Sequence, residues 1–281
     1  MSKPIRVALS GSGFRLGAHL GALQAIEDAG YTIVELAGTS GGSIVASLYA
    51  SGLPLDVMRQ MLMELDWSPM MSFSPWTFLR RQALCSGNQL LCYLTQSTAG
   101  KTFSQLEIDL KVIATNLLTE REFQFSKLAT PDVPIALAAR ASASIPIVFV
   151  PVSVAGGLMV DGGMCDNIPV SDLTVDGVPR VGIYLQSDDA PLPLGAYGIG
   201  TLAPRMIDIM LASNEDSHLA LDTLSGATIV RVPTGYASSF DRRMAVATRQ
   251  RLYDDGYNTT ISALRTQDFV HQQQAQLVER Y

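Results

Sequence analysis

The pentapeptide at residues 38–42, Gly-Thr-Ser-Gly-Gly, constrains the fold of this chain more than any other feature of its sequence. It follows an apolar run that predicts a strand over residues 31–36 and precedes an apolar stretch, residues 43–49, that predicts a helix. G-x-S-x-G between a strand and a helix is typical of an elbow that exposes the serine as a nucleophile. The helix N-terminus behind Ser40 also offers unpaired N–H groups to a developing negative charge.

The pattern on both sides of this elbow predicts an α/β protein. The first fifty residues read as strand, helix, strand and helix with short connections, which indicates a parallel sheet covered on both faces. Further strands are expected over residues 109–118, 122–125, 148–154, 158–160, 181–185 and 228–232. Further helices are expected over residues 55–65, 134–143, 199–224 and 241–264.

Composition excludes several functional classes. The formal net charge is −6 and the basic residues are scattered, so we expect no nucleic-acid partner. Three cysteines without C-x-x-C spacing indicate reduced thiols, and three histidines argue against a dedicated zinc site. The first strand begins almost at once, and no apolar stretch reaches the ~18 residues of a membrane span. We therefore expect a cytoplasmic protein, which leaves work at a membrane surface open.

A glycine turn, Gly11-Ser12-Gly13, follows the first predicted strand, over residues 5–9. Its N–H groups can form an anion-binding nest between strand and helix. Beside Ser40, such a nest would serve as an oxyanion hole, to which the N–H of Gly41 would contribute a further donor.

The same turn has a competing interpretation as a dinucleotide-binding loop. Gly11, Gly13 and Gly17 form G-x-G-x-x-x-G after a strand, and Glu35 follows at a distance that suits a ribose ligand. This alternative explains the glycines but leaves Ser40 unexplained.

A nucleophilic serine needs a base. His218 and His271 follow Asp161 in the chain, so a Ser–acid–His order is formally present. The elbow, however, follows the second predicted strand rather than a central strand deep in the chain. We therefore interpret both histidines as surface or helix-packing residues, and His19 as structural.

Asp161 is the better candidate for the base. It follows a predicted strand and precedes Gly162-Gly163, which places its carboxylate at a strand end on a tight turn. Acting as a base would require Asp161 to lie within hydrogen-bonding reach of Ser40. The alternative is an aspartate that only caps the turn.

The segment at residues 54–96 differs from the rest of the chain, since it holds both tryptophans and five of the eleven methionines. Such a segment is either a lid or membrane-touching surface, or part of the core. We prefer core packing, because methionine fills irregular interiors.

Three motifs in this order resemble the patatin-like phospholipase family: residues 9–15 (LSGSGFR), 38–43 (GTSGGS) and 161–163 (DGG). Two further stretches, residues 139–146 and 160–170, are also similar to it, as is the strand region 111–119. The resemblance covers about residues 5–190.

The resemblance implies a three-layer fold with a mostly parallel central sheet and helices on both faces. It also implies a single domain over residues 1–281, with a motif-bearing core of about 5–190 and a mostly helical part at 191–281. The chain departs from the family pattern at Ser12, which replaces a glycine, and at Leu16, where a glycine is common and Gly17 follows one step later.

By the same resemblance, Ser40 is the nucleophile and Asp161 its base, in a dyad without histidine. The oxyanion hole is assigned to Gly11, Ser12, Gly13 and Gly41, Arg15 supports the loop, and the motif glycines are Gly38, Gly42, Gly162 and Gly163.

The function implied is hydrolysis of carboxylic esters of lipids, of the phospholipase A or lysophospholipase type, without metal or cofactor. The partner is a phospholipid or another acyl lipid, with transient membrane contact through residues 54–96. Two alternatives stay open: acyl transfer or thioester hydrolysis on the same dyad, and a weakly active regulatory binding protein. The sequence leaves the oligomeric state open.

Overall fold

The computed structural model describes residues 2–81, 83–186, 195, 205, 209 and 215–278, with the backbone alone at 81, 215–219 and 267–278. The strands are β1 (Lys3–Leu9), β2 (Tyr31–Thr39), β3 (Asp109–Asn116), β4 (Arg121–Ser126), β5 (Val152–Val154), β6 (Gly157–Asp161), β7 (Arg180–Gln186) and β8 (Thr228–Pro233). The α-helices are α1 (Leu16–Asp28), α2 (Gly41–Ala50), α3 (Leu55–Glu64), α4 (Pro75–Arg81), α5 (Asn88–Ser97), α6 (Ile135–Ser142), α8 (Glu215–Leu224) and α9 (Val246–Val278).

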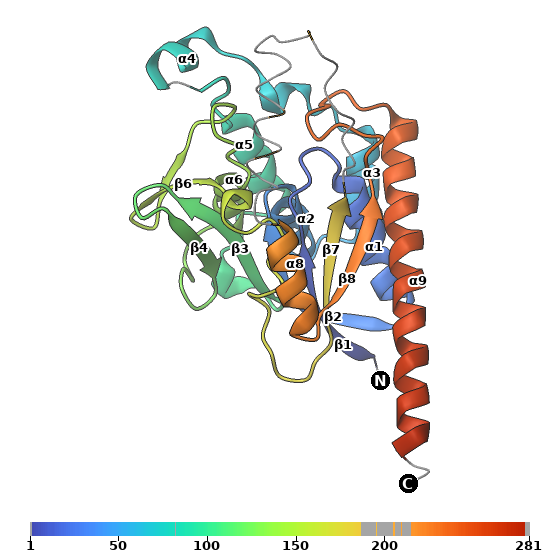
Figure 1. The fold of residues 1–281 in the computed structure, drawn as a ribbon. Helices are drawn as coiled ribbons and strands as arrows, with labels where there is room; N and C mark the ends of the chain where they lie inside the picture. Colours follow the sequence, from blue (N-terminus) through green and yellow to red (C-terminus); the bar gives the residue numbers. More distant parts are fainter. Residues whose placement is uncertain are drawn as a thin grey trace.

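The strands form one mixed sheet in the order β5-β6-β3-β2-β1-β7-β8, with β4 paired to β3 (Figure 1). The pairs β1–β2, β1–β7, β2–β3 and β7–β8 are parallel, whereas β3–β4, β3–β6 and β5–β6 are antiparallel. The expected α/β sheet flanked by helices is confirmed. The antiparallel strands gather at one end of the sheet, where the sequence pattern changes from βα units to hairpins.

Two expected elements differ from the structure. Of the strand expected over residues 148–154, only Val152–Val154 forms β5; Phe149 instead makes an isolated bridge with Cys85. Of the helix expected over 199–224, α8 is present, and most of residues 199–214 lie outside the described residues. Helices α4 and α5 were not expected, since large apolar side chains obscure the helical period there.

Helices α1 and α9 pack closely against each other beside the sheet (Figure 1). A Cβ at Gly21 would lie 2.0 Å from the carbonyl oxygen of Tyr253, and one at Gly17 would lie 2.9 Å from that of Arg249. The absence of side chains therefore lets the two backbones touch. Gly17, the third glycine of the dinucleotide alternative, serves this helix crossing.

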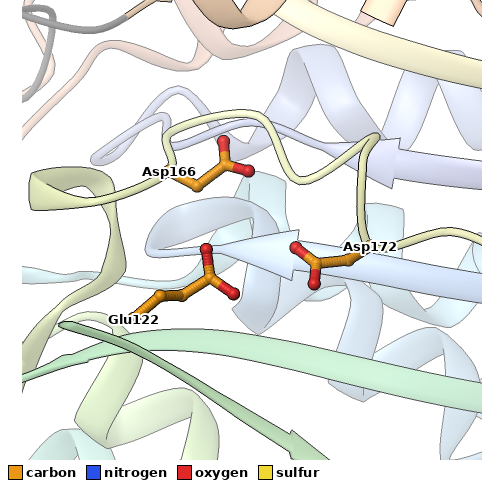
Figure 2. A group of neighbouring side chains, drawn as sticks. All are labelled: Glu122, Asp166 and Asp172. Atoms are coloured by element: carbon orange, nitrogen blue, oxygen red, sulfur yellow. The ribbon is translucent and has the colours of Figure 1, made fainter. Parts of the chain in front are cut away.

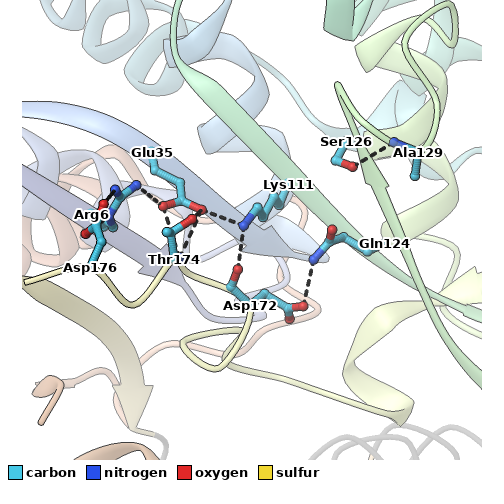
Figure 3. A network of polar contacts seen from close by, with 9 residues as sticks. All are labelled: Arg6, Glu35, Lys111, Gln124, Ser126, Ala129, Asp172, Thr174 and Asp176. Carbon is cyan, nitrogen blue, oxygen red and sulfur yellow. Dashed lines mark hydrogen bonds and ion pairs between the residues drawn. The ribbon is translucent and has the colours of Figure 1, made fainter. Parts of the chain in front are cut away.

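Glu35 of β2 is buried in an ion-pair network with side chains of the neighbouring strands β1 and β3 (Figure 3). Its carboxylate pairs with Arg6 and with Lys111, whose Nζ lies 2.6 Å from Oε1. It also accepts hydrogen bonds from the N–H and hydroxyl of Thr174. Both oxygens are therefore engaged inside the protein, and Glu35 does not present a carboxylate to a ribose.

The segment at residues 54–96 divides into two parts. Met58, Trp67 and Met70 are buried in the main core, as the core interpretation predicts. Trp76 on α4 is instead 70% exposed. Neither of the two interpretations drawn from the sequence therefore describes the whole segment.

Removing the Glu35 carboxylate should destabilise the fold strongly. Glu35→Ala leaves Arg6 and Lys111 partly buried without their shared counter-charge, so the free energy of unfolding should fall by about 3 kcal/mol. Urea unfolding at neutral pH measures this change. Glu107→Ala, at an exposed glutamate, is the control and should change stability by about 0.5 kcal/mol or less. Equal effects of the two substitutions would contradict the prediction.

Candidate active site

Ser40 lies at a sharp turn between β2 and α2, and its backbone has φ 50° and ψ −121°. A residue with a side chain is strained at such a positive φ, so the surroundings must hold it there. The glycines make the turn possible. A Cβ at Gly38 would lie 2.8 Å from the Cα of Ser43, and one at Gly42 would lie 2.4 Å from the carbonyl oxygen of Leu9.

The Ser40 hydroxyl donates a hydrogen bond to Asp161, with 2.7 Å between Oγ and Oδ2. The other carboxylate oxygen, Oδ1, accepts the N–H of Gly163 at 2.9 Å. One oxygen of Asp161 therefore caps the turn, and the other lies within the hydrogen-bonding reach of Ser40 that a base would require.

Strand pairing explains how two residues 121 positions apart meet. Thr39 of β2 pairs with Ile113, and Asp161 of β6 pairs with the next residue, Ala114. Because β4 occupies the opposite edge of β3 along Lys111–Asn116, β2 and β6 share the same edge. The two strands run toward each other along this edge and meet end to end. Ser40, just after β2, therefore lies beside Asp161 at the end of β6.

Burial raises the pKa of Asp161 to about 6, although the hydrogen bonds from Ser40 and Gly163 act in the opposite direction. The cause is desolvation, which disfavours the ionised carboxylate. At neutral pH the group is mostly ionised, and it is a stronger base than an exposed aspartate.

Helix α6 holds both members of this pair. The N–H of Ser40 donates to Oγ of Ser142 at 2.8 Å, and the Ser142 hydroxyl donates to the carbonyl of Ile113. Just after the helix, the carbonyl of Ser144 accepts the N–H of Asp161 at 3.0 Å. These contacts give a structural role to the stretch at residues 139–146, for which sequence reasoning assigned no role.

Arg140 of α6 is also buried, and burial lowers its pKa to about 10. Its guanidinium donates to the carbonyl oxygens of Ser86, Gly87 and Val150. The helix that positions Ser40 therefore also anchors two loops beside it.

The glycine turn lies against Ser40. A Cβ at Gly11 would be 3.7 Å from the Cβ of Ser40, and one at Gly41 would be 2.1 Å from Oγ of Ser12. Gly13 has φ +55°, whereas Ser12 does not have a positive φ. The serine that replaces the usual glycine therefore fits without backbone strain.

The expected oxyanion donors are not equivalent. The N–H of Gly11 donates to the carbonyl of Asn167 at 2.9 Å, so Gly11 permits close approach but its N–H is already used. In the part of the chain that the structure describes, the N–H groups of Ser12, Gly13 and Gly41 donate to no protein acceptor. These three N–H groups are therefore available to a further acceptor.

Two buried side chains fix the glycine turn from behind. Arg15 donates through Nε to the carbonyl of Ser12 at 3.1 Å and through Nη1 to the hydroxyl of Thr234. His19 donates through Nε2 to the carbonyl of Ser10 at 2.7 Å, and burial lowers its pKa to about 3. His19 is therefore a neutral structural residue. The side chains of His218 and His271 lie outside the described residues.

The loop after Gly163 joins the serine turn to the glycine turn. The hydroxyl of Thr39 donates to the carbonyl of Asp166 at 2.9 Å, while the carbonyl of Asn167 accepts the N–H of Gly11. The carboxylate of Asp166 also caps the N–H of Ile168. The contacts of this loop with two remote turns carry no local sequence signal.

An apolar cavity opens beside Ser40. Gly13, Ser40 and Gly41 form its polar end. Its apolar lining includes Phe14, Leu16, Ile44, Trp67, Met70, Met71, Leu90, Ile145, Phe149 and Phe240. The site therefore combines a hydrogen-bonded serine, free N–H groups and a wall suited to a hydrocarbon chain.

Three acidic side chains point toward one another near the loop that follows Gly163: Glu122, Asp166 and Asp172 (Figure 2). One carboxylate oxygen from each lies within 4.8 Å of those of the other two. Burial, together with their mutual repulsion, raises the pKa of Glu122 to about 7 and that of Asp172 to about 6. Among the described residues, this group comes closest to a set of cation ligands. None of the three contacts the Ser40 hydroxyl, and Asp166 already caps its own turn.

The family model of the patatin-like phospholipases matches residues 7–174, which include the glycine turn, the elbow and Asp161. This chain belongs to the patatin-like phospholipase family. At the level of the family, the supported function is lipid hydrolysis.

Curated relatives agree with this assignment. The chain is 31% identical over 231 residues to an uncharacterized protein of Acanthamoeba polyphaga mimivirus, covering 76% of this chain and 77% of that one. It is 29% identical over 197 residues to an uncharacterized NTE family protein of Mycobacterium tuberculosis, covering 67% and 51%. It is 30% identical over 205 residues to a lysophospholipase of Pyricularia oryzae, covering 70% and 13%. The chain thus spans about half of the mycobacterial relative and a small part of the fungal one.

Solved structures share the fold of this patatin-like protein. VipD from Legionella pneumophila superposes with a TM-score of 0.62 at 17% identity, over 94% of this chain and 67% of VipD. The type III effector ExoU superposes with a TM-score of 0.54 at 15% identity, over 95% of this chain and 53% of ExoU. Within the described residues, no helix has the length and apolarity needed to cross a membrane.

Ser142 provides a direct test of how the elbow is held. Ser142→Ala leaves the buried N–H of Ser40 without an acceptor, so the free energy of unfolding should fall by about 1–3 kcal/mol. Ser47→Ala is the matched control, because Ser47 is an equally buried helical serine whose hydroxyl has no partner among the described residues. Denaturant unfolding of both variants measures the difference, and equal stabilities would show that this hydrogen bond does not hold the elbow.

Proposed function

We propose that this protein is a lipid acyl hydrolase of the phospholipase A or lysophospholipase type, with Ser40 as nucleophile and Asp161 as general base. The observation that carries the proposal is the 2.7 Å hydrogen bond from Ser40 Oγ to Asp161 Oδ2 beside an apolar cavity. A serine becomes a nucleophile when an adjacent base can take its proton. Here the base contacts the hydroxyl directly, so no intervening imidazole is needed.

The environment of Asp161 suits this role. Burial raises its pKa to about 6, which brings it closer to neutral pH and makes the ionised form a better proton acceptor. The hydrogen bond between Gly163 and Oδ1 fixes the carboxylate and leaves Oδ2 directed at the hydroxyl. The proton therefore has a short and defined path.

The N–H groups of Ser12, Gly13 and Gly41 are the proposed oxyanion donors. Gly41 is the first residue of α2, where a helix N–H has no intrahelical acceptor. Gly13 and Gly41 line the same cavity as Ser40, which places them beside an acyl group held there. Each such donor contributes roughly 10²–10³ to the rate of acyl transfer reactions.

The reaction then proceeds in two halves. Ser40 Oγ attacks the carbonyl carbon of the acyl ester as its proton moves to Asp161, and the free N–H groups stabilise the tetrahedral oxyanion. Asp161 returns the proton to the leaving alcohol, which gives an acyl-serine and a lipid that has lost one chain. In the second half, Asp161 takes a proton from water as the water oxygen attacks the acyl-serine carbonyl, and it returns that proton to Ser40 Oγ as the ester bond breaks and the fatty acid leaves.

The apolar lining favours a lipid substrate over a polar ester. Trp67 and Met70 come from the 54–96 segment and Phe14 from the glycine turn, and Phe14 and Trp67 pack with ring centroids 5.9 Å apart. An acyl chain in this cavity would extend away from Ser40 along hydrocarbon side chains. Transfer of the acyl group to another acceptor would use the same first half-reaction.

Ser40→Ala should abolish turnover of phospholipid and of a soluble short-chain ester. Asp161→Asn should lower kcat by about 10²–10⁴, because it keeps the shape but removes the base. A fluorophosphonate probe followed by peptide mapping should label Ser40 in the parent protein. Ser47→Ala is the control and should label normally, since Ser47 lies in α2 with its hydroxyl unpaired.

Wild-type turnover by either site variant would refute the dyad, as would the absence of labelling at Ser40. Product analysis separates the chemical alternatives. Free fatty acid and lysolipid indicate hydrolysis, whereas an acyl group on a second alcohol or thiol indicates transfer.

Activity should depend on pH through Asp161. The base works only when ionised, so kcat/KM for a soluble ester should rise with pH through a midpoint near the Asp161 pKa of about 6 and level off roughly one unit above that pKa. The pH dependence of probe labelling should follow the same curve, because both reactions begin with attack by Ser40. A rate that stays flat from about pH 4 to 8 would exclude a carboxylate with this raised pKa as the base.

A further inference from the structure

Helix α4 is the tip of a short excursion that leaves the fold and returns at once. The N–H of Ser74 donates to the carbonyl of Leu84 at 3.1 Å, which closes the excursion at its base. The chain that returns from α4 is bonded to residues 147–148. The N–H of Leu84 donates to the carbonyl of Ile147 at 2.8 Å, and the N–H of Cys85 donates to that of Val148 at 2.8 Å. Figure 1 shows α4 projecting at the end of the molecule toward which β7 and β8 point.

The base of this excursion forms part of the cavity beside Ser40. Met71 and Phe149 line that cavity. Phe149 also belongs to a small core with Cys85, Ile145 and Val148, against which Met71 packs. The excursion therefore projects from the same wall that would hold an acyl chain.

The outer side of the excursion is apolar and uncovered. Among exposed side chains, Leu79 is 74% exposed, Trp76 70%, Phe73 60%, Ile147 60% and Phe78 50%. We name these five side chains the α4 surface. Isolated exposed apolar residues are ordinary, but three large ones within the excursion, with Phe73 and Ile147 at its base, indicate an interaction surface.

The charge around the α4 surface has the opposite sign to that of the whole chain. The formal net charge is −6, yet residues 67–106 contain no aspartate or glutamate, and α4 ends with Arg80 and Arg81. Arg80 is exposed, lies with its guanidinium carbon 5.5 Å from the ring centroid of Trp76, and has no ion pair among the described residues. An apolar surface with arginine at its border matches an anionic lipid interface.

We propose that the α4 surface docks this protein on anionic lipid bilayers and thereby brings the cavity beside Ser40 to its substrate. The apolar side chains enter the interfacial region, and Arg80 contacts lipid phosphates. The identity of the substrate rests on the proposed function, whereas the docking surface rests on its own geometry and charge.

Vesicle sedimentation tests the docking surface separately from catalysis. The background protein is Ser40→Ala, so that bound lipid is not consumed, and the vesicles are phosphatidylcholine alone or mixed with phosphatidylserine. The double substitution Trp76→Ser with Leu79→Ser should weaken binding to mixed vesicles about tenfold or more. Arg80→Gln should weaken it about fivefold and leave binding to phosphatidylcholine alone unchanged.

Leu128→Ser is the matched control. Leu128 is 95% exposed, and it lies beside the beginning of β3, at the opposite end of the strands from Ser40. This variant should bind vesicles like the parent. Thermal unfolding of every variant should give the parental Tm, since the substituted side chains are exposed.

Equal vesicle binding by the parent and the double variant would overturn the proposal, as would equal affinity for anionic and neutral vesicles. A double variant that alters only the oligomeric state in size-exclusion chromatography would overturn it in favour of contact between copies. Hydrolysis of a soluble ester by the wild-type protein reports separately on the proposed function. Vesicle binding that depends on α4, together with an absence of ester turnover, would support the docking surface and contradict the proposed function.

Discussion

The strained backbone at Ser40 is the constraint on which the rest of the site depends. A positive φ at a serine costs of order 1–3 kcal/mol and persists only where neighbouring contacts hold it. Here the N–H of Ser40 is held by Ser142, and bare glycine backbone packs on both sides of the turn. The same turn places the hydroxyl against Asp161, and within the described residues the N–H of Gly41 at the start of α2 has no acceptor.

Burial then determines what this arrangement can do. The carboxylate of Asp161 receives only two hydrogen bonds in a desolvated position, so its pKa rises rather than falls. Glu35 shows the opposite balance, since two cations and Thr174 lower its pKa despite burial. The same sheet thus contains one carboxylate kept ionised for stability and one whose affinity for a proton is raised beside a hydroxyl.

The segment between α2 and β3 connects this chemistry to the surface. Trp67, Met70 and Leu90 of this segment contribute to the cavity wall, whereas α4 between them carries exposed apolar side chains. Both parts are rich in large apolar residues, so composition alone cannot separate a buried wall from a docking surface. The structure separates the two, since Trp67 is buried in the core whereas Trp76 is exposed on α4, beyond the Ser74–Leu84 hydrogen bond that closes the base of the excursion.

The sequence by itself determined most of the strands and helices, the elbow at Ser40 and the glycine turn, because these depend on local periodicity and on glycine chemistry; it missed α4 and α5. It also proposed Asp161, but it could not bring that residue to Ser40. Only the tertiary structure decided this contact, through the end-to-end meeting of β2 and β6 on one edge of β3. Strand register and the support from Ser142 are non-local, so no pattern of neighbouring residues encodes them; desolvation of Asp161 likewise exists only once the chain has packed.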